Sequence, residues 1–192
     1  MLLLEEKLDR AEQIIYNPSF RKNNGLGNEI GYYIFDYPDD KELFVRERIE
    51  NMRKKIRNPD DEYEIIVFDL YSIMIDILKE KGYLEKCYEF EKRNGFERIT
   101  KSIGNMLRIT SVDNLIIQRI SKSTPEKAIV FITGVGKCYT ILRSHTLLNN
   151  LHQVIDNVPV VMFYPGKYNG QELMLFGKIK YDNYYRAFKL VD

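Results

Sequence analysis

The sequence predicts an α/β fold, a Rossmann-like, three-layer arrangement in which helices cover both faces of a mostly parallel β-sheet. Strand-like and helix-like segments alternate along the chain, which is the pattern of parallel strands joined by crossover helices. Two strand-like segments, 64–70 and 128–133, contain unbroken apolar runs, as interior strands do when both of their faces are buried. The C-terminus departs from this alternation. There, two strand-like segments flank a short turn, which predicts a β-hairpin at the sheet edge.

The first half of the chain predicts two amphipathic helices and two strands. Apolar residues recur at helical spacing before Pro18, which ends the first helix. A second helix follows Asp39, which can act as its N-cap, with Glu42 placed three residues later to complete a capping box. The expected elements are a helix at 2–16, a loop at 19–31, a strand at 32–37, a helix from 39 to Asn58-Pro59, and a strand at 64–70.

Residues 71–121 are helical throughout by pattern, and we expect four short helices there. Breaks are predicted at Gly82 and at Asn94-Gly95, with an N-cap at Thr110 or Ser111. Because the chain contains no internal repeat and no linker, we expect one domain spanning 1–192, with 71–122 as a helical insertion within it.

The remaining elements complete the sheet. A buried strand at 128–133 precedes a helix at about 141–155, and a further strand follows at 159–164. The predicted C-terminal hairpin has strands at 173–180 and 184–190, around Tyr181-Asp182-Asn183.

The charge balance argues against binding through phosphates alone. Lys and Arg total 29 and Asp and Glu total 28, a formal charge of +1, whereas nucleic-acid-binding proteins usually carry a basic excess. The basic run between positions 46 and 57 is interrupted by Glu47 and Glu50, which favours a solvated helix face over a DNA-binding stripe. We therefore expect any contact with nucleic acid to be indirect.

The cysteines and the hydropathy pattern favour the cytoplasm. Cys87 and Cys138 show no metal-binding or disulfide spacing, so two separate thiols in a reducing compartment are expected. The apolar run at the N-terminus is too short for a signal peptide, and no segment has the about 18 apolar residues that a membrane helix needs. No cofactor, metal site or membrane contact is predicted.

The carboxyl ends of the predicted strands are where ligands gather in such sheets. The most suggestive of these positions is the turn Thr133–Lys137, where Gly134, Gly136 and Lys137 could contact an anion, with Arg143 nearby in sequence. The turn is shorter than a Walker A loop, and Cys138 stands where a magnesium-binding hydroxyl would be needed. A plain strand-to-helix turn is favoured over a nucleotide site.

Two carboxylates and two histidines could carry chemistry. Asp36 and Asp69 each end a strand, where they could hold Mg²⁺ or exchange a proton, although a helix cap or an ion pair is favoured. His145 and His152 lie on one face of a predicted helix but form no zinc spacing, so packing or surface roles are favoured. The sequence predicts no catalytic residue.

Tyrosine and phenylalanine are concentrated near the C-terminus. Packing within the fold is the first explanation, a protein-binding surface the second, and base stacking the third. The candidate partner-binding residues are Tyr164, Tyr168, Tyr184, Tyr185 and Arg186.

A series of segments, taken together in this order, resembles the BrxB family. The match spans nearly the whole chain and is weakest in the helical region 71–122, and no single motif is diagnostic. The segments are Ile34-Phe35-Asp36-Tyr37, Val45-Arg46, Phe68-Asp69-Leu70, 130–136, Leu142-Arg143-Ser144-His145, 148–151, 160–166, Leu175-Phe176-Gly177 and 183–188.

The resemblance implies a role in BREX bacteriophage defence, in systems that also contain a large ATPase, a DNA methyltransferase and a phosphatase-like protein. It implies no catalytic mechanism. We expect a non-enzymatic adaptor first, a nucleotide or phosphate sensor using the Gly134–Lys137 turn second, and a metal-dependent nuclease or phosphatase third.

Overall fold

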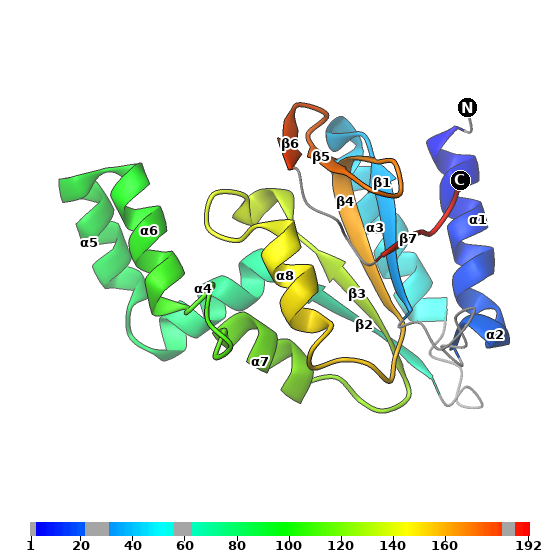
Figure 1. Ribbon diagram of the computed structural model, residues 1–192, viewed down its shortest axis with the longest axis horizontal. Helices are drawn as coiled ribbons and strands as arrows, with labels where there is room; N and C mark the ends of the chain where they lie inside the picture. The colour runs from blue at the N-terminus through cyan, green and yellow to red at the C-terminus, as the bar shows by residue number, and fades with distance from the viewer. Residues whose placement is uncertain (1–2, 22–30, 56–62, 182–186) are drawn as a thin grey trace.

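The computed structural model describes residues 3–21, 31–55, 63–181 and 187–192. Its sheet has the strand order β2-β3-β4-β1-β7, in which every neighbouring pair is parallel (Figure 1). These strands are β1 (Tyr32–Tyr37), β2 (Glu64–Asp69), β3 (Ala128–Thr133), β4 (Val160–Tyr168) and β7 (Phe188–Lys189). The predicted fold class is therefore confirmed, and the predicted strands at 32–37 and 128–133 match the observed bounds.

Helices cover both faces of the sheet, because alternate strand residues point to opposite sides. On one face, α1 (Leu4–Tyr16) and α3 (Glu42–Lys55) pack against Phe131 and Phe163. On the other face, α4 (Leu70–Glu80), α7 (Leu115–Lys122) and α8 (Ser144–Leu151) pack against the neighbouring positions, including Ile132 and Met162. The remaining helical elements are α2 (Pro18–Arg21), η1 (Asp39–Lys41), α5 (Leu84–Asn94), α6 (Phe96–Met106) and η2 (Gly136–Cys138).

The connections leave the sheet toward opposite faces. The chain leaves β1 toward the α3 face, whereas it leaves β2 and β3 toward the face covered by α4, α7 and α8. The strand β4 lies between β3 and β1. The carboxyl end of β4 therefore marks the point where the winding of the sheet reverses, which is where open α/β sheets form a crevice.

The region between β2 and β3 contains the four predicted helices, α4 to α7. Its breaks fall at Gly82 and Gly95, as predicted. Both glycines have positive φ. The predicted cap at Thr110 or Ser111 was wrong, because Asn114 caps α7 by accepting hydrogen bonds from the first amides of that helix. Asn114 is fully buried, and its side-chain NH₂ group donates a hydrogen bond to the Ile109 carbonyl.

The C-terminal hairpin forms, but its predicted turn was wrong. Its strands are β5 (Leu173–Leu175) and β6 (Ile179–Tyr181), joined at 176–178, and β5 pairs with the end of β4. The turn takes this position because Phe176 and Gly177 adopt positive φ, of 54° and 65°. Of the later predicted strand, 184–190, residues 184–186 lie outside the described residues, and the described part contains β7, which pairs with β1 in parallel.

Two further expectations were wrong in detail. The capping box at Asp39 does not form, since the chain enters a 3₁₀ turn after Pro38 that no side chain caps, and Glu42 binds other partners. The helix expected at 141–155 is limited to α8, because the chain first makes the short η2 turn and then extends at Arg143.

Candidate functional site

A crevice of about 260 Å³ lies at the reversal point of the sheet, beside the carboxyl end of β4. We call it the switch-point crevice. The residues that line it come from η1, the start of α3, the turn after β3, β4 and the hairpin turn. They are Asp39, Glu42, Arg46, Gly136, Lys137, Pro165 and Phe176.

The glycine turn after β3 uses its own backbone amides. The N–H groups of residues 137, 138 and 139 donate to the carbonyls three residues earlier, at 3.1, 3.2 and 3.4 Å. Amides that are already bonded within a 3₁₀ turn are poorly placed to surround an anion. Of the groups predicted for anion binding, the turn therefore offers the Lys137 side chain more readily than its backbone.

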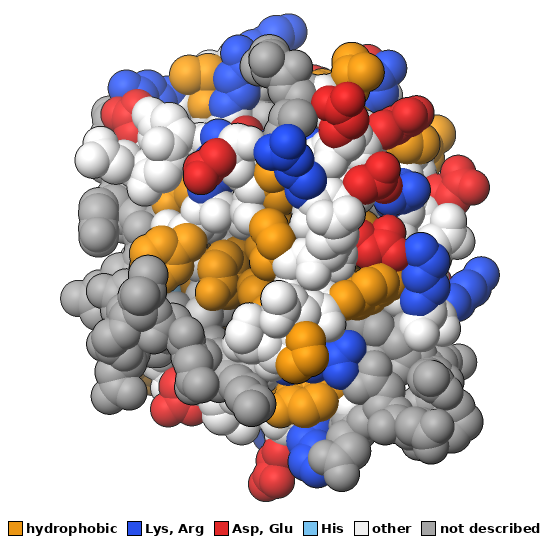
Figure 2. All heavy atoms as spheres, turned by 90° about the vertical axis from the view of Figure 1, so that its right-hand side faces the viewer, with side chains coloured by type: hydrophobic (Ala, Val, Ile, Leu, Met, Phe, Trp, Pro, Cys, Tyr) orange, Lys and Arg blue, Asp and Glu red, His pale blue; other side chains and the backbone are white. Residues whose placement is uncertain are grey.

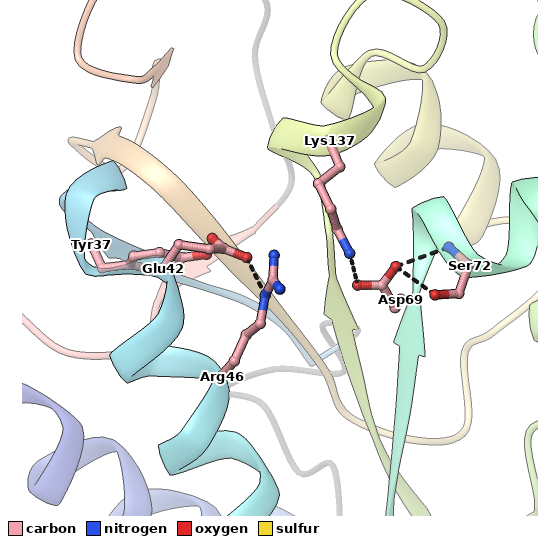
Figure 3. A network of polar contacts seen from close by, with 6 residues as sticks. All are labelled: Tyr37, Glu42, Arg46, Asp69, Ser72 and Lys137. Atoms are coloured by element: carbon pink, nitrogen blue, oxygen red, sulfur yellow. Dashed lines mark hydrogen bonds and ion pairs between the residues drawn. The ribbon is translucent and has the colours of Figure 1, made fainter.

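Lys137 binds Asp69 across the glycine turn (Figure 3). The Lys137 Nζ lies 2.5 Å from Asp69 Oδ2, while Asp69 Oδ1 accepts hydrogen bonds from the Ser72 amide and hydroxyl at 2.9 and 3.1 Å. Burial would raise the pKa of Asp69, but the bonds from Lys137 and Ser72 outweigh it and lower the pKa below its ordinary value. Asp69 thus caps α4 and fixes Lys137, which agrees with the favoured interpretation of this carboxylate.

Gly134 allows this ion pair to form. Its φ is +74°, and a Cβ at that position would lie 2.9 Å from Asp69 Oδ2 and 3.0 Å from Lys137 Cε. A larger residue would therefore be strained in its backbone and would collide with the pair. The absence of a side chain at Gly134 therefore leaves room for Asp69 and Lys137 to pack against its backbone.

A second ion pair faces the crevice from α3. Arg46 Nε donates to Glu42 Oε1 at 2.9 Å, and the Tyr37 hydroxyl donates to the other oxygen of Glu42 (Figure 3). Burial and the hydrogen bond to Glu42 both raise the pKa of Tyr37, so that hydroxyl remains a donor. The Glu42 carboxylate is thus held from two sides and orients the guanidinium.

Phe176 from the hairpin turn covers the glycine turn. A Cβ on Gly136 would lie 2.8 Å from Phe176 Cε1 and 3.1 Å from Pro165 Cγ, so the ring rests against the backbone. Phe176 also makes an edge-to-face contact with Tyr139, with ring centroids 6.3 Å apart. These contacts explain how a phenylalanine is held at positive φ.

A larger groove of about 440 Å³ adjoins the crevice, with Asp39 and Phe176 lining both. Apolar side chains and three lysines contribute to its walls. The remaining lining residues are Leu4, Lys7, Asp36, Tyr37, Pro38, Gly166, Lys167, Gly177, Lys189 and Asp192.

The two strand-end carboxylates do not share a ligand site. Asp36 accepts hydrogen bonds from Lys7 Nζ at 2.5 Å and from the Tyr168 amide at 3.0 Å, whereas Asp69 binds Lys137. Within the described ranges, no group of three or more His, Cys, Asp and Glu side chains could hold a metal ion. Each carboxylate is therefore tied to its own lysine.

The other predicted partner and anion residues are dispersed. Arg143 is exposed just before α8. The pKa of His145 is lowered mainly by burial of its ring, and the Arg143 charge lowers it further. Tyr164 is fully buried, and the buried Tyr168 hydroxyl donates to the Ala187 carbonyl at 2.7 Å. Both tyrosines pack inside the fold, and 184–186 lie outside the described residues.

Cys138 and His152 make packing contacts within the fold. Cys138 is 1% exposed, and burial together with the nearby Asp69 charge raises its pKa to about 12. The His152 ring lies against Tyr32, with centroids 3.7 Å apart, as expected for a packing role.

Sequence reasoning missed Arg46 and Phe176 as crevice residues. The spacing of Glu42 and Arg46 is a helical ion-pair signal, but the strand order decides that this pair faces Lys137. Phe176 gives no comparable signal, because its role depends on the observed hairpin turn at 176–178, which was predicted at a later position.

Charges on the surface are balanced locally. Arg48 pairs with Asp9 and Glu12, and Lys55 also pairs with Glu12. Acids of α1 and of α3 itself therefore offset most of the basic side chains in the described part of the run, 46–55. Figure 2 shows blue and red side chains interspersed on this side of the molecule, with small orange groups between them. In the part of the chain that the structure describes, no helix has the length and apolar character needed to cross a membrane.

A family model and two similar proteins match most or all of the chain, and all three carry the same description. A family model described as "BREX protein BrxB" matches residues 66–190. A Bacillus cereus (strain H3081.97) protein named "BREX protein BrxB" is 51% identical over 192 residues, which is the full length of both chains. An Escherichia coli O9:H4 (strain HS) protein of the same name is 34% identical over 189 residues, or 98% of this chain and 92% of that protein. No solved structure matches the chain.

Proposed function

The chain belongs to the BrxB family, and from that premise we propose that it is a non-enzymatic, protein-binding component of a BREX bacteriophage-defence system. The names of both relatives place them in BREX systems, which supports other BREX proteins as its partners. The large ATPase, the phosphatase-like protein and the DNA methyltransferase of such systems are the candidates. Any nucleic acid is contacted through them.

A projecting helical hairpin is the observation that carries this proposal. The helices α5 and α6 pack against each other and extend away from the sheet, on the side opposite the two termini (Figure 1). We call this pair of helices the arm. Only Cys87, Ile99 and Thr100 of its residues are buried, so most of the surface of both helices faces solvent.

The arm exposes large aromatic side chains. Phe96 is 61% exposed, Tyr88 48% and Phe90 38%. Exposed aromatic residues are enriched at protein interfaces, because they bury much area with few rotatable bonds. This surface replaces Tyr164 and Tyr168 as the proposed contact region, since those two side chains are buried.

The charges of the arm favour a protein partner over nucleic acid. Glu89 lies within 4 Å of both Lys92 and Arg93, and Lys101 lies 3.5 Å from Glu97. A surface that binds the phosphate backbone of nucleic acid would instead present a clear excess of cations over acids.

Co-purification from cells that carry the complete BREX system tests the proposal. A tagged full-length chain should retain at least one other BREX protein. The double substitution Tyr88→Ala/Phe96→Ala should lose that protein and lower phage resistance in a plaque assay. Leu43→Ala is the matched control, because Leu43 is 76% exposed but lies on α3, outside the arm.

Two outcomes would contradict different parts of the proposal. If the tagged wild-type chain retains no BREX protein, the adaptor function is wrong. If the arm variant retains the same proteins as Leu43→Ala, the adaptor function stands but the arm is not the contact surface. Thermal melting of both variants checks that each one is folded.

A further inference from the structure

Two cations from distant parts of the chain face the switch-point crevice. Arg46 comes from α3 and Lys137 from the turn after β3, and their side chains are 42% and 33% exposed. Figure 3 shows the two side chains reaching toward each other, each beside its own carboxylate. Such convergence of cations from separate elements is how proteins bind oxyanions.

The ion pairs leave most of the N–H donors of these cations unused. Within the described residues, Arg46 donates one side-chain hydrogen bond, through Nε to Glu42, and Lys137 donates one, to Asp69. A guanidinium has five N–H donors and an ammonium has three. The terminal amino groups of Arg46 and two protons of Lys137 therefore make no further hydrogen bond among the described residues, while Lys137 Nζ also lies 5.5 Å from the centroid of the Tyr71 ring.

The carboxylates beside them are hydrogen-bonded on both oxygens. Both oxygens of Glu42 accept hydrogen bonds, from Tyr37 and Arg46, and both oxygens of Asp69 accept bonds from Ser72 or Lys137. The crevice therefore offers N–H donors beside carboxylates that are already hydrogen-bonded, and a third carboxylate, Asp39, also lines it. Because the acids offset the cations, binding depends on directed hydrogen bonds and should be moderate in strength.

The space fits a phosphoryl group with an organic substituent. The crevice has a volume of about 260 Å³ and meets the 440 Å³ groove at Phe176. Sites for small molecules are commonly about 300–1,000 Å³, largely apolar, with a few polar groups that fix orientation. The crevice supplies such polar groups, and the groove supplies apolar walls from Leu4, Tyr37 and Pro38.

From these observations we infer that the switch-point crevice binds the phosphoryl group of a small phosphate ester. Arg46 and Lys137 hold its oxygens, and the organic part lies in the groove past Phe176. The inference goes beyond the adaptor function and does not depend on it. It also replaces Arg143 with Arg46 as the arginine that acts with Lys137.

Isothermal titration of the full-length chain with four probes tests the inference. Inorganic phosphate, AMP, ribose 5-phosphate and adenosine separate the phosphoryl group from the organic part. AMP or ribose 5-phosphate should bind more tightly than inorganic phosphate, and adenosine should bind most weakly. AMP binding tighter than ribose 5-phosphate would indicate that a base occupies the groove.

Substitutions then locate the site. Arg46→Gln and Lys137→Gln should each weaken ester binding at least about 10-fold, the effect of losing a charged hydrogen bond. Arg143→Gln is the matched control and should leave binding unchanged. Phe176→Ala should alter ester affinity while leaving that of inorganic phosphate within about 2-fold. Arg46→Lys keeps the charge, and its intermediate affinity would show that a loss in Arg46→Gln is not due to misfolding.

Three results would overturn the inference. One is no binding of AMP, ribose 5-phosphate or phosphate at about 10 mM. Another is adenosine binding as tightly as AMP, which would remove the role of the phosphoryl group. The third is equal ester affinity in wild type, Arg46→Gln and Lys137→Gln, which would place any binding elsewhere.

Discussion

Replacing Asp36 tests whether a strand-end carboxylate is structural. Its side chain and that of Lys7 are 13% and 17% exposed, and Asp36→Ala would leave both the Lys7 ammonium and the Tyr168 amide without this acceptor. Breaking a buried pair from one side costs about 3–5 kcal/mol. Lys7 keeps its bond to the Asp36 main-chain carbonyl at 2.6 Å, which lowers this cost to about 2–3 kcal/mol. The lost amide bond adds about 1 kcal/mol, so Asp36→Ala should lower the free energy of unfolding by about 3–4 kcal/mol.

Urea unfolding of a double-mutant cycle measures the pair itself. Asp36→Asn keeps an acceptor for the Tyr168 amide, so it should cost about 2–3 kcal/mol. Adding Lys7→Met should recover about 1–2 kcal/mol of that cost, because the unpaired charge is removed.

Phage resistance of the same variants separates a structural role from a chemical one. A structural carboxylate predicts that Lys7→Met/Asp36→Asn protects cells better than Asp36→Asn alone. The reasoning is refuted if Asp36→Asn changes the unfolding free energy by less than about 0.5 kcal/mol and still abolishes resistance.

Three further predictions concern stability and reactivity. Asn114→Ala should cost about 2–4 kcal/mol of unfolding free energy, because the buried amide caps α7 and satisfies a buried carbonyl. Thr110→Ala, at an exposed position, should stay within about 0.5 kcal/mol, and equal costs in urea unfolding would contradict the assigned cap. Since burial raises the pKa of Cys138 to about 12, iodoacetamide at about pH 8 should modify it far more slowly in the native protein than in urea. Modification at the rate of a free thiol would show that Cys138 is accessible. The pKa of Asp69 is lowered from 3.8 by folding, so its stabilisation is present above that pH and lost as the pH falls. The stability difference between wild type and Asp69→Asn should therefore be larger at about pH 7 than at about pH 2, and an unchanged difference would refute this linkage.

The strands were predictable because their apolar runs are a local property. The segments 32–37 and 128–133 have the predicted bounds, since burial on both faces demands apolar residues at nearly every position. The hairpin was harder to place because Asp182-Asn183 is the stronger turn composition, while the actual turn requires Phe176 at positive φ. Contacts with Gly136 and Pro165 hold Phe176 there, and they depend on the folded sheet.

The candidate site was predictable only in part, for the same reason. The rule that ligands gather at strand carboxyl ends selected Lys137 and Asp69, and the structure joins them. Arg46 belongs to a run of basic residues, for which the sequence predicted only a solvent-exposed helix face. The crossing of α3 over the sheet brings it to the crevice, and that placement follows from the strand order β2-β3-β4-β1.

The state of Asp69 favours binding over turnover at this edge of the sheet. A general acid or base works best when its pKa lies near the working pH, whereas the bonds from Lys137 and Ser72 move the pKa of Asp69 further below neutrality. Cys138, next to Lys137, is shifted the other way by burial, so its thiol stays protonated and is a poor nucleophile. The N–H donors of Arg46 and Lys137, by contrast, can hold an anion without transferring a proton to it.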